Sequence, residues 1–169
     1  QIQAVYGLCG GSLSVSAALA DFTFMEKKAK LFFHAPNAIS GNTEAELDTA
    51  SAEFRSEESG TADFVGTQEE IAAGIRTLVG VLPSSNEDDE SYGDCEDSLN
   101  RLVPEVVQAS GAGVLRAISD DGFVCEPGQH YGCSVTTAFI RLNGRCDCGG
   151  IRRSLFPWRR ESGALCKIL

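Results

Sequence analysis

A glycine-rich stretch between two apolar segments constrains the fold of this chain more than any other feature. The β-prone residues Ile2–Tyr6 lead directly into Gly7-Leu8-Cys9-Gly10-Gly11-Ser12, which favours a tight turn over a central strand. Small and apolar side chains at 13–19 predict a short, well-buried helix, with Ser12 or Ser14 capping its first turn. Strands are then predicted over 21–25 and 30–33. Strand, glycine turn, helix and strand in succession form a crossover unit, which indicates an α/β fold.

A second helix is predicted by a complete set of boundary signals. Thr67-Gln68-Glu69-Glu70 has the pattern of a capping box, apolar residues follow at helical spacing, and Pro83 ends the run. Residues 84–100 then contain seven acidic residues and no basic one. Such a charge run is typical of a solvated linker.

A hairpin signal follows a third β-prone segment. Residues 134–142 favour a strand and end in Asn143-Gly144, a dipeptide that strongly predicts a tight hairpin turn. The partner strand should begin at Arg145, but the residues from Arg145 to Gly150 show no strand alternation. The sequence therefore predicts that the return strand is missing.

Composition excludes several classes of protein. With 43% hydrophobic and 22% charged residues among 169, the chain is globular rather than disordered or fibrous. A net charge of -10 argues against nucleic acid or an anionic membrane surface as a partner. No apolar run approaches the ~18 residues that cross a bilayer, so membrane insertion is not expected. Seven cysteines without a framework spacing predict free thiols in a reducing compartment, and hence a cytoplasmic protein.

Three groups of motifs carry a resemblance to a known family. Gly7–Ser12 followed by Ala18-Leu19-Ala20-Asp21-Phe22 and Phe24-Met25 resembles a stretch of the carboxyltransferase (beta) subunits of biotin-dependent acyl-CoA carboxylases and decarboxylases. Ser59-Gly60 with Asp63, then Ile75-Arg76 and Leu82-Pro83, is similar to the end of that family's first domain. Asp120–Phe123 and Phe139–Gly144 are similar to the entry into its second domain. Order and spacing agree over about residues 1–144, and Ser12 departs from the family by replacing a glycine.

The resemblance implies a fold and a domain organisation. The expected fold is α/β, part of a crotonase-like ββα superhelix that comprises the end of a first domain and the start of a second. Residues 1–83 would be the C-terminal part of the carboxyltransferase N-terminal domain, and 84–100 the acidic linker. Residues 101–144 would open the C-terminal domain, and 145–169 form an atypical basic tail. We expect the chain to be a fragment of a longer enzyme and inactive alone.

The resemblance also implies a reaction and its participants. A carboxyl group would move between carboxybiotin and an acyl-CoA of the acetyl-, propionyl- or methylmalonyl-CoA type, through a thioester enolate. The implied cofactors are biotin on a carrier protein or domain and a CoA thioester substrate, with no metal bound by this chain. The implied partners are a biotin carboxyl carrier protein, a biotin carboxylase and further copies of the subunit.

The candidate site residues are Gly10, Gly11 and Ser12, expected to act through their main-chain N–H groups. Glycine lets the backbone approach a ligand closely, and preorganised N–H donors stabilise the oxyanion that develops in the transition state. The sequence contains only two histidines, His34 and His130, and no convincing nucleophile and base pair. We therefore expect neither histidine at the site, and Cys9 to be a small buried hydrophobe.

Three alternatives stay open. The first is a biotin-dependent acyl-CoA decarboxylase subunit, which would use the same oxyanion chemistry in the other direction. The second is a small zinc-binding module that uses His130, Cys133, Cys146 and Cys148, although this spacing is irregular. The third is an inactive truncated product that exposes apolar faces and sheet edges and therefore self-associates.

The end of the chain differs from the rest. Residues 1–140 contain 7 basic and 22 acidic residues, whereas residues 141–169 contain 7 and 2 and also hold three of the seven cysteines. Bases that encode Arg145–Gly149 can encode Asp-Val-Thr-Val-Gly when they are translated one position later. We interpret the tail as the product of a frameshift. Genomic sequence would exclude this interpretation if neither shifted reading frame downstream of Gly144 encoded the family's strand.

Overall fold

The structure is a computed structural model that describes residues 1–152, apart from residues 36, 39–42, 46, 86, 88–93, 99 and 133. The chain forms two compact units. The first contains Gln1–Arg76 together with Pro127–Tyr131, and the second contains Thr77–Glu126 and the described residues from Gly132 onward. No helix among the described residues is long and apolar enough to span a membrane.

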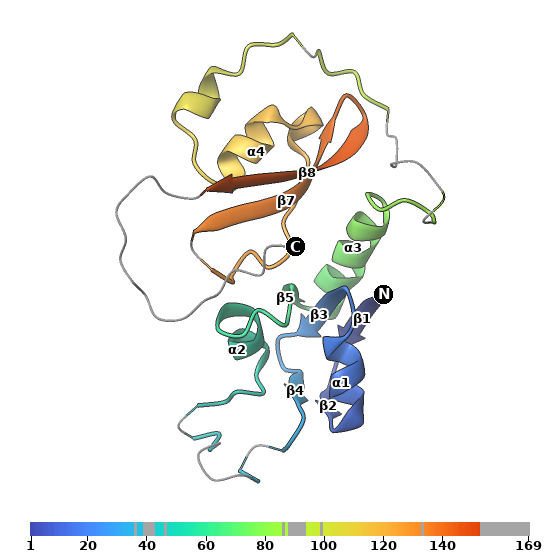
Figure 1. Cartoon of the computed structure of the whole chain (residues 1–169), viewed down its shortest axis with the longest axis vertical. Coiled ribbons are helices and arrows are strands. Elements are labelled where there is room, and N and C mark those ends of the chain that lie inside the picture. The colour runs from blue at the N-terminus through green and yellow to red at the C-terminus, as the bar shows by residue number, and fades with distance from the viewer. Residues whose placement is uncertain are drawn as a thin grey trace. The chain divides into compact units, whose positions relative to one another are not determined.

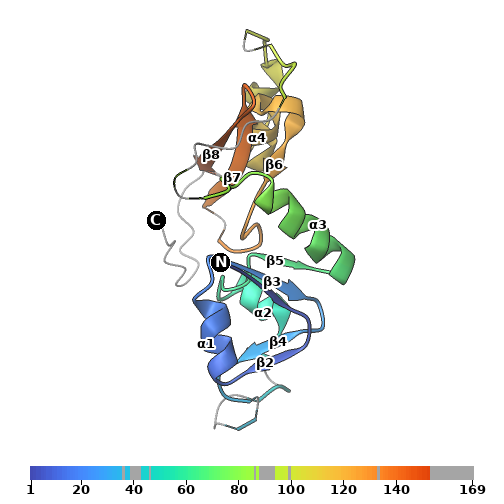
Figure 2. The same cartoon turned by 90° about the vertical axis from the view of Figure 1, so that its right-hand side faces the viewer.

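The first unit is built from repeated ββα turns of the chain. Its elements are β1 (Ile2–Val5), β2 (Leu8–Gly10), α1 (Ser12–Ala18), β3 (Phe22–Glu26), β4 (Lys30–Phe32), α2 (Ala52–Glu57), β5 (Phe64–Gly66) and α3 (Gln68–Val79), whose last residues pass into the second unit. The first strands of the repeats form a parallel sheet of order β1-β3-β5, and the second strands form a parallel pair, β2-β4 (Figure 2). This order confirms the ββα superhelix that the sequence led us to expect.

The glycine-rich stretch is a strand followed by a turn, which corrects the expectation of one tight turn from Gly7 to Ser12. Leu8–Gly10 pairs in parallel with Lys30–Phe32, and the chain turns only at Gly11. The strand forms because Cys9, 4% exposed, anchors it in the core, and because its edge position tolerates glycine.

The predicted cap of α1 was also wrong. Gly11 is the N-cap residue and no side chain caps the helix. The Ser14 hydroxyl instead donates to the carbonyl of Gly11 at 2.7 Å. A side-chain cap accepts hydrogen bonds from the first N–H groups of a helix, whereas the Ser14 hydroxyl donates one to a carbonyl. The first N–H groups of α1 therefore have no side-chain cap.

Small buried side chains let the layers of the first unit approach closely. The core contains Val5, Cys9, Ala17, Met25, Ala29, Leu31, Ala52 and Ala62, each at most 4% exposed. Burial raises the pKa of the Cys9 thiol, as expected for a thiol that packs as a hydrophobe.

Two motifs of the first unit have structural roles. The capping box that begins α3 is confirmed: Glu70 Oε2 accepts from Thr67 N at 2.7 Å, and Thr67 Oγ1 accepts from Glu70 N at 3.3 Å. In the Ser-Gly-x-x-Asp motif, Asp63 Oδ2 accepts from Thr23 N at 2.8 Å, and burial raises the pKa of the Asp63 carboxyl. Gly60 has a φ of 63° and lies under the ring of Tyr131.

The second unit packs a short helix on an antiparallel sheet (Figure 1). Its elements are η1 (Pro104–Val107), α4 (Ala112–Ile118), η2 (Asp120–Gly122), β6 (Val124–Cys125), β7 (Val135–Leu142) and β8 (Arg145–Arg152), with the sheet order β6-β7-β8. Leu115 of α4 meets Ala138 and Ile140 of β7 in a small core.

The return strand that we expected to be missing is present as β8. It pairs with β7 over its whole length, from Leu142 opposite Arg145 to Val135 opposite Arg152. The turn determines the pairing: Asn143 and Gly144 have φ values of 56° and 77°, and the ladder that follows is made by the main chain whatever the side chains are. Because this strand is present, its absence can no longer be used as evidence for a frameshift. The frameshift hypothesis is then supported only by the reversal of charge and by the crowding of cysteines near the end of the chain. Residues 153–169 lie outside the described residues.

Candidate functional site

The turn between β2 and α1 directs the main-chain N–H groups of its three residues, Gly10, Gly11 and Ser12, to different surroundings. Gly11 has φ 63° and ψ -135°, a conformation open essentially only to glycine, and no atom lies near the place of a Cβ. Its N–H donates to the carbonyl oxygen of Phe32 at 3.1 Å, which extends the β2-β4 ladder by one bond. In this conformation the Gly11 N–H is occupied, so it is unavailable to a ligand.

Gly10 presents its N–H on the other side of the strand. N–H groups alternate between the two edges of a strand, and the neighbouring Gly11 N–H is directed to β4. The Gly10 N–H is therefore directed to the opposite edge of β2, where the described residues supply no further strand. Such an edge leaves main-chain donors available to other groups.

Ser12 and Leu13 supply the remaining donors at the start of α1. Neither N–H has an acceptor among the described residues, as is usual for the first residues of a helix without a side-chain cap. Ser12 is exposed and Leu13 is 58% exposed, whereas the next N–H, that of Ser14, donates to Gly11 at 3.2 Å. The Leu13 donor was missed from the sequence, although counting the unpaired N–H groups of a first turn would have found it.

The observed contacts of the two histidines do not pair either of them with a nucleophile of this turn, and Cys9 is buried. His34 is exposed and makes an edge contact with Phe33, with ring centroids 4.7 Å apart. His130 lies 2.8 Å from the side-chain nitrogen of Gln129. Neither pairing provides a nucleophile with a base.

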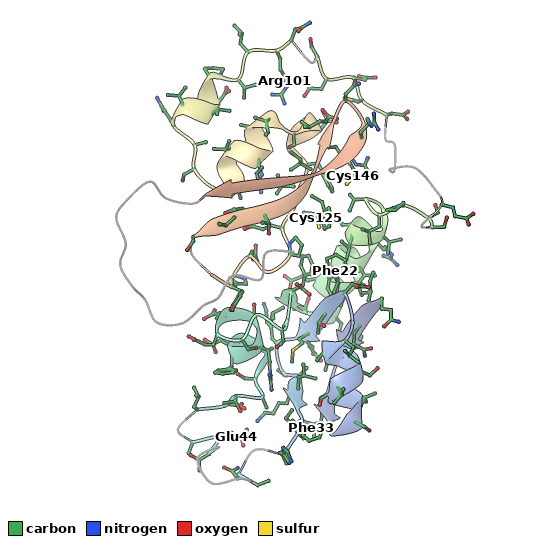
Figure 3. All side chains as sticks on the ribbon, viewed as in Figure 1. Phe22, Phe33, Glu44, Arg101, Cys125 and Cys146 are labelled. Atoms are coloured by element: carbon green, nitrogen blue, oxygen red, sulfur yellow. The ribbon has the colours of Figure 1, made fainter. Side chains whose placement is uncertain are left out.

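The zinc alternative falls largely outside the described residues. Cys133 is not described, nor is the side chain of Cys148. In the described part of the chain, no group of three histidine, cysteine or carboxylate side chains could hold a metal ion. Cys125 and Cys146 lie on β6 and β8 (Figure 3), and burial, with a smaller contribution from Cys146, raises the pKa of the Cys125 thiol.

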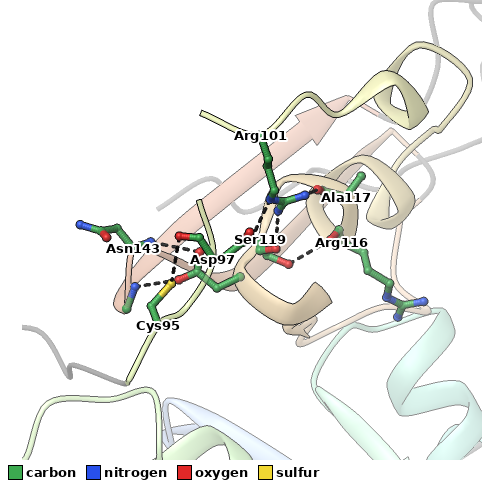
Figure 4. A network of polar contacts seen from close by, with 9 residues as sticks. Cys95, Asp97, Arg101, Arg116, Ala117, Ser119 and Asn143 are labelled. Carbon is green, nitrogen blue, oxygen red and sulfur yellow. Dashed lines mark hydrogen bonds and ion pairs between the residues drawn. The ribbon is translucent and has the colours of Figure 1, made fainter. Parts of the chain in front are cut away.

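A polar network in the second unit was not expected from the sequence (Figure 4). Arg101 binds Asp97 at 2.7 Å through Nε and donates to the carbonyls of Ala117 and Ser119 at 3.0 and 2.9 Å. The network borders a cavity of about 410 Å³ lined by Asp97, Arg101, Leu102, Glu105, Arg116, Ala117, Ser119, Asp121 and Gly122. Asp97, which the charge pattern assigned to a solvated linker, is therefore held against the unit.

Asp120 connects this network to the β7-β8 turn. It is 8% exposed, and its carboxylate oxygens accept from Asn143 N at 3.1 Å and Gly144 N at 2.7 Å. Burial alone would raise the pKa of Asp120. The two main-chain donors, Cys95 and the charge of Arg101 outweigh burial and hold the pKa below its ordinary value. Asp120 is therefore a structural carboxylate.

Comparison with known proteins identifies the family. The family model described as "Carboxyl transferase domain" matches residues 1–146. The chain belongs to the carboxyl transferase domain family. This confirms the resemblance carried by the glycine turn and the later motifs.

The relatives of this carboxyl transferase chain include proteins named as decarboxylase subunits and proteins named as carboxylase chains. It is 31% identical to the methylmalonyl-CoA decarboxylase subunit alpha of Propionigenium modestum and 30% identical to the mitochondrial propionyl-CoA carboxylase beta chain of Rattus norvegicus. Each match covers 86% of this chain, but only 31% and 29% of those relatives. The chain thus spans less than a third of the length of these proteins.

A solved structure supports the fold of the carboxyl transferase chain. The transcarboxylase 12S structure, described with methylmalonyl-coenzyme A and methylmalonic acid bound, matches with a TM-score of 0.74 and 28% identity. The match covers 88% of this chain and 31% of that one. A single-chain, multi-domain long-chain acyl-CoA carboxylase has the same fold, with a TM-score of 0.62 and 18% identity.

Proposed function

We propose that this chain is part of a carboxyltransferase that moves a carboxyl group between carboxybiotin and an acyl-CoA through a thioester enolate. The observation that carries the proposal is the unpaired Ser12 N–H in a turn whose Gly11 N–H is bound to Phe32. The family membership supports the same reaction class. The acyl-CoA would be of the acetyl-, propionyl- or methylmalonyl-CoA type.

The proposed role of the turn is to bind the thioester oxygen when it becomes negative. Removal of an α-proton places charge on that oxygen, and the Ser12 N–H would donate to it, with Gly10 and Leu13 supplying further donors nearby. A single preorganised donor of this kind stabilises a transition state by roughly 2.7–4 kcal/mol. Biotin would arrive as a co-substrate on a carrier and supply or accept the carboxyl group, and we assign no residue of this chain to it.

The proposal extends to the surroundings of the chain. A biotin carboxyl carrier protein, a biotin carboxylase and further copies of the subunit would be its partners, in the cytoplasm. Residues 1–83 would complete a first domain and 101–144 begin a second, joined by residues 84–100. The chain alone would not turn over acyl-CoA, because the donors for the second oxyanion, on biotin, would lie in other chain segments.

Decarboxylation is the second candidate. The relatives named as a decarboxylase subunit and as a carboxylase chain are 31% and 30% identical to this chain, so both directions are equally supported. The same donors would serve a decarboxylase, since its thioester enolate carries the same charge. A gene for a membrane decarboxylase subunit beside this one would favour this candidate, and a biotin carboxylase gene would favour carboxylation.

A matched pair of glycine substitutions tests the proposed function. Gly111, the N-cap of α4, has φ 55° and ψ -129°, close to the values of Gly11, and also begins a helix of seven residues. Gly11→Ala and Gly111→Ala therefore impose similar backbone strain, but only the first alters the Ser12 N–H. Calorimetric titration with propionyl-CoA, whose thioester oxygen is still neutral, should show affinity weakened about 2- to 10-fold by Gly11→Ala and nearly unchanged by Gly111→Ala, since a neutral hydrogen bond contributes about 0.5–1.5 kcal/mol. Equal effects of the two variants, or no binding to the unaltered chain, would contradict the proposal.

A further inference from the structure

Phe32 contacts the glycine turn twice, through its main chain and through its ring. Its carbonyl oxygen accepts the Gly11 N–H at 3.1 Å. Phe32 is also the residue opposite Gly10 in the β2-β4 pair, and its ring lies against the Gly10 backbone. One residue of β4 therefore holds both residues that precede Ser12.

The Phe32 ring, rather than the backbone conformation, opposes a side chain at position 10. A Cβ built on Gly10 would lie 2.5 Å from Cε2 of Phe32 and 3.0 Å from its Cζ, far inside van der Waals contact. Gly10 is not among the glycines with a positive φ. Gly11 is the reverse case, with a φ of 63° and open space around the place of a Cβ. A side chain would thus be opposed by the Phe32 ring at position 10 and by the backbone conformation at position 11.

We propose that Phe32 is a positioning residue for the Ser12 N–H. The inference rests on the proposed function and adds the residue that sets the geometry of its donor. The ring packs on Gly10 and fixes the end of β2, and the carbonyl fixes Gly11, so the chain reaches Ser12 in one orientation. A substitution at position 32 keeps the carbonyl, and therefore measures what the ring contributes.

Phe33 provides a matched control beside it. It is 58% exposed, and its ring makes an edge contact with His34. Phe33→Leu removes an aromatic ring from the same segment as Phe32→Leu does. A difference between the two variants therefore reports the contact with Gly10 and not a general loss of aromatic surface.

The test follows the Ser12 amide by NMR in the ¹⁵N-labelled chain, with propionyl-CoA as the probe and CoA as the control ligand. In the unaltered chain and in Phe33→Leu, propionyl-CoA should shift the Ser12 amide resonance and CoA should not. In Phe32→Leu the shift should be lost or at least halved, with an apparent Kd about 2- to 10-fold weaker, since a misplaced donor forms a weaker hydrogen bond. Thermal unfolding of each variant checks that it is folded.

Gly10→Ala tests the same contact from the other side and serves if Phe32→Leu fails to fold. Its added methyl group should also abolish the Ser12 shift, and the double variant Gly10→Ala with Phe32→Leu should recover part of it, because the smaller side chain leaves room. A Ser12 shift that survives both single variants overturns the role of Phe32 alone. Absence of the shift in the unaltered chain overturns the proposed function, and the role of Phe32 with it.

Discussion

The carboxylate of Asp120 accepts a hydrogen bond from the Gly144 N–H at 2.7 Å, and thereby ties the η2 turn to the tip of the β7-β8 hairpin. The adjacent Asn143 N–H donates to the other carboxylate oxygen at 3.1 Å. These two donors belong to a turn with positive φ at both central residues, where no ladder bond can use them. Asp120 therefore stabilises the turn that starts β8.

Removal of this carboxylate should destabilise the second unit. Asp120→Asn keeps one acceptor oxygen but places an NH₂ group against a main-chain donor, so we expect a loss of about 1.5–3 kcal/mol in the free energy of unfolding. Asp121→Asn is the matched control, because Asp121 is exposed and asparagine tolerates its φ of 50°. Urea unfolding measures both, and equal losses would contradict the account of Asp120.

The stabilisation by Asp120 should depend on pH. Its pKa is lower in the folded chain than in the unfolded one, so its contribution is complete above an unfolded pKa of about 3.9 and is lost as the pH falls through the folded value. The difference in unfolding free energy between the unaltered chain and Asp120→Asn should therefore shrink as the pH falls from 5 to 3. A difference that stays constant over this range would show that the charge has no part in it.

Gly60 and Gly128 should differ in their tolerance of alanine. Both have a φ near 65°, which costs a non-glycine residue about 1–2 kcal/mol. A Cβ at Gly60 would also lie 2.7 Å from ring atoms of Tyr131, whereas nothing lies within 4 Å of one at Gly128. We expect Gly60→Ala to be the more destabilising in thermal unfolding, and Tyr131→Ala to remove the excess in the double variant. Equal effects at the two glycines would contradict the observed ring contact.

The isolated chain should self-associate through its first unit. Helix α1 carries no charged residue in its first or last turn. Several large apolar side chains around β2 and α1 are exposed, namely Tyr6, Leu8, Leu13, Val15, Leu19 and Phe33. Exposed apolar surface together with a strand edge favours association. Sedimentation should show concentration-dependent oligomers that Leu19→Gln weakens and Leu47→Gln, at a residue 56% exposed elsewhere, does not. A monomer at all concentrations would contradict this prediction.

The elements that the sequence predicted well are those with local signals. The capping box of Thr67 and Glu70, and the strands and helix around the glycine turn, depend on short-range patterns that the fold preserves. The resemblance supplied what those patterns lack, the family and the ββα order.

The failures came from pairings between distant residues. Leu8–Gly10 pairs as a strand with the distant Lys30–Phe32, and the Gly11 N–H is occupied because Phe32 presents a carbonyl there. We missed β8 in the sequence because we expected alternating polar and apolar side chains in a strand. The tight turn and the main-chain hydrogen bonds of the β7-β8 pair form this strand without that alternation. The candidate site at this turn stays a prediction, and one of its three expected donors, the Gly11 N–H, is already bound to Phe32.

A comparison of two ligands tests the central claim most directly. Propionyl-CoA has a thioester oxygen, and its thioether counterpart S-propyl-CoA lacks that oxygen but keeps the nucleotide and a chain of similar length. If the Ser12 N–H binds the thioester oxygen, its ¹⁵N and ¹H resonances will shift with propionyl-CoA and not with S-propyl-CoA. Equal shifts with both ligands, or no shift with either, would contradict the claim that this amide recognises the oxygen on which the enolate charge develops.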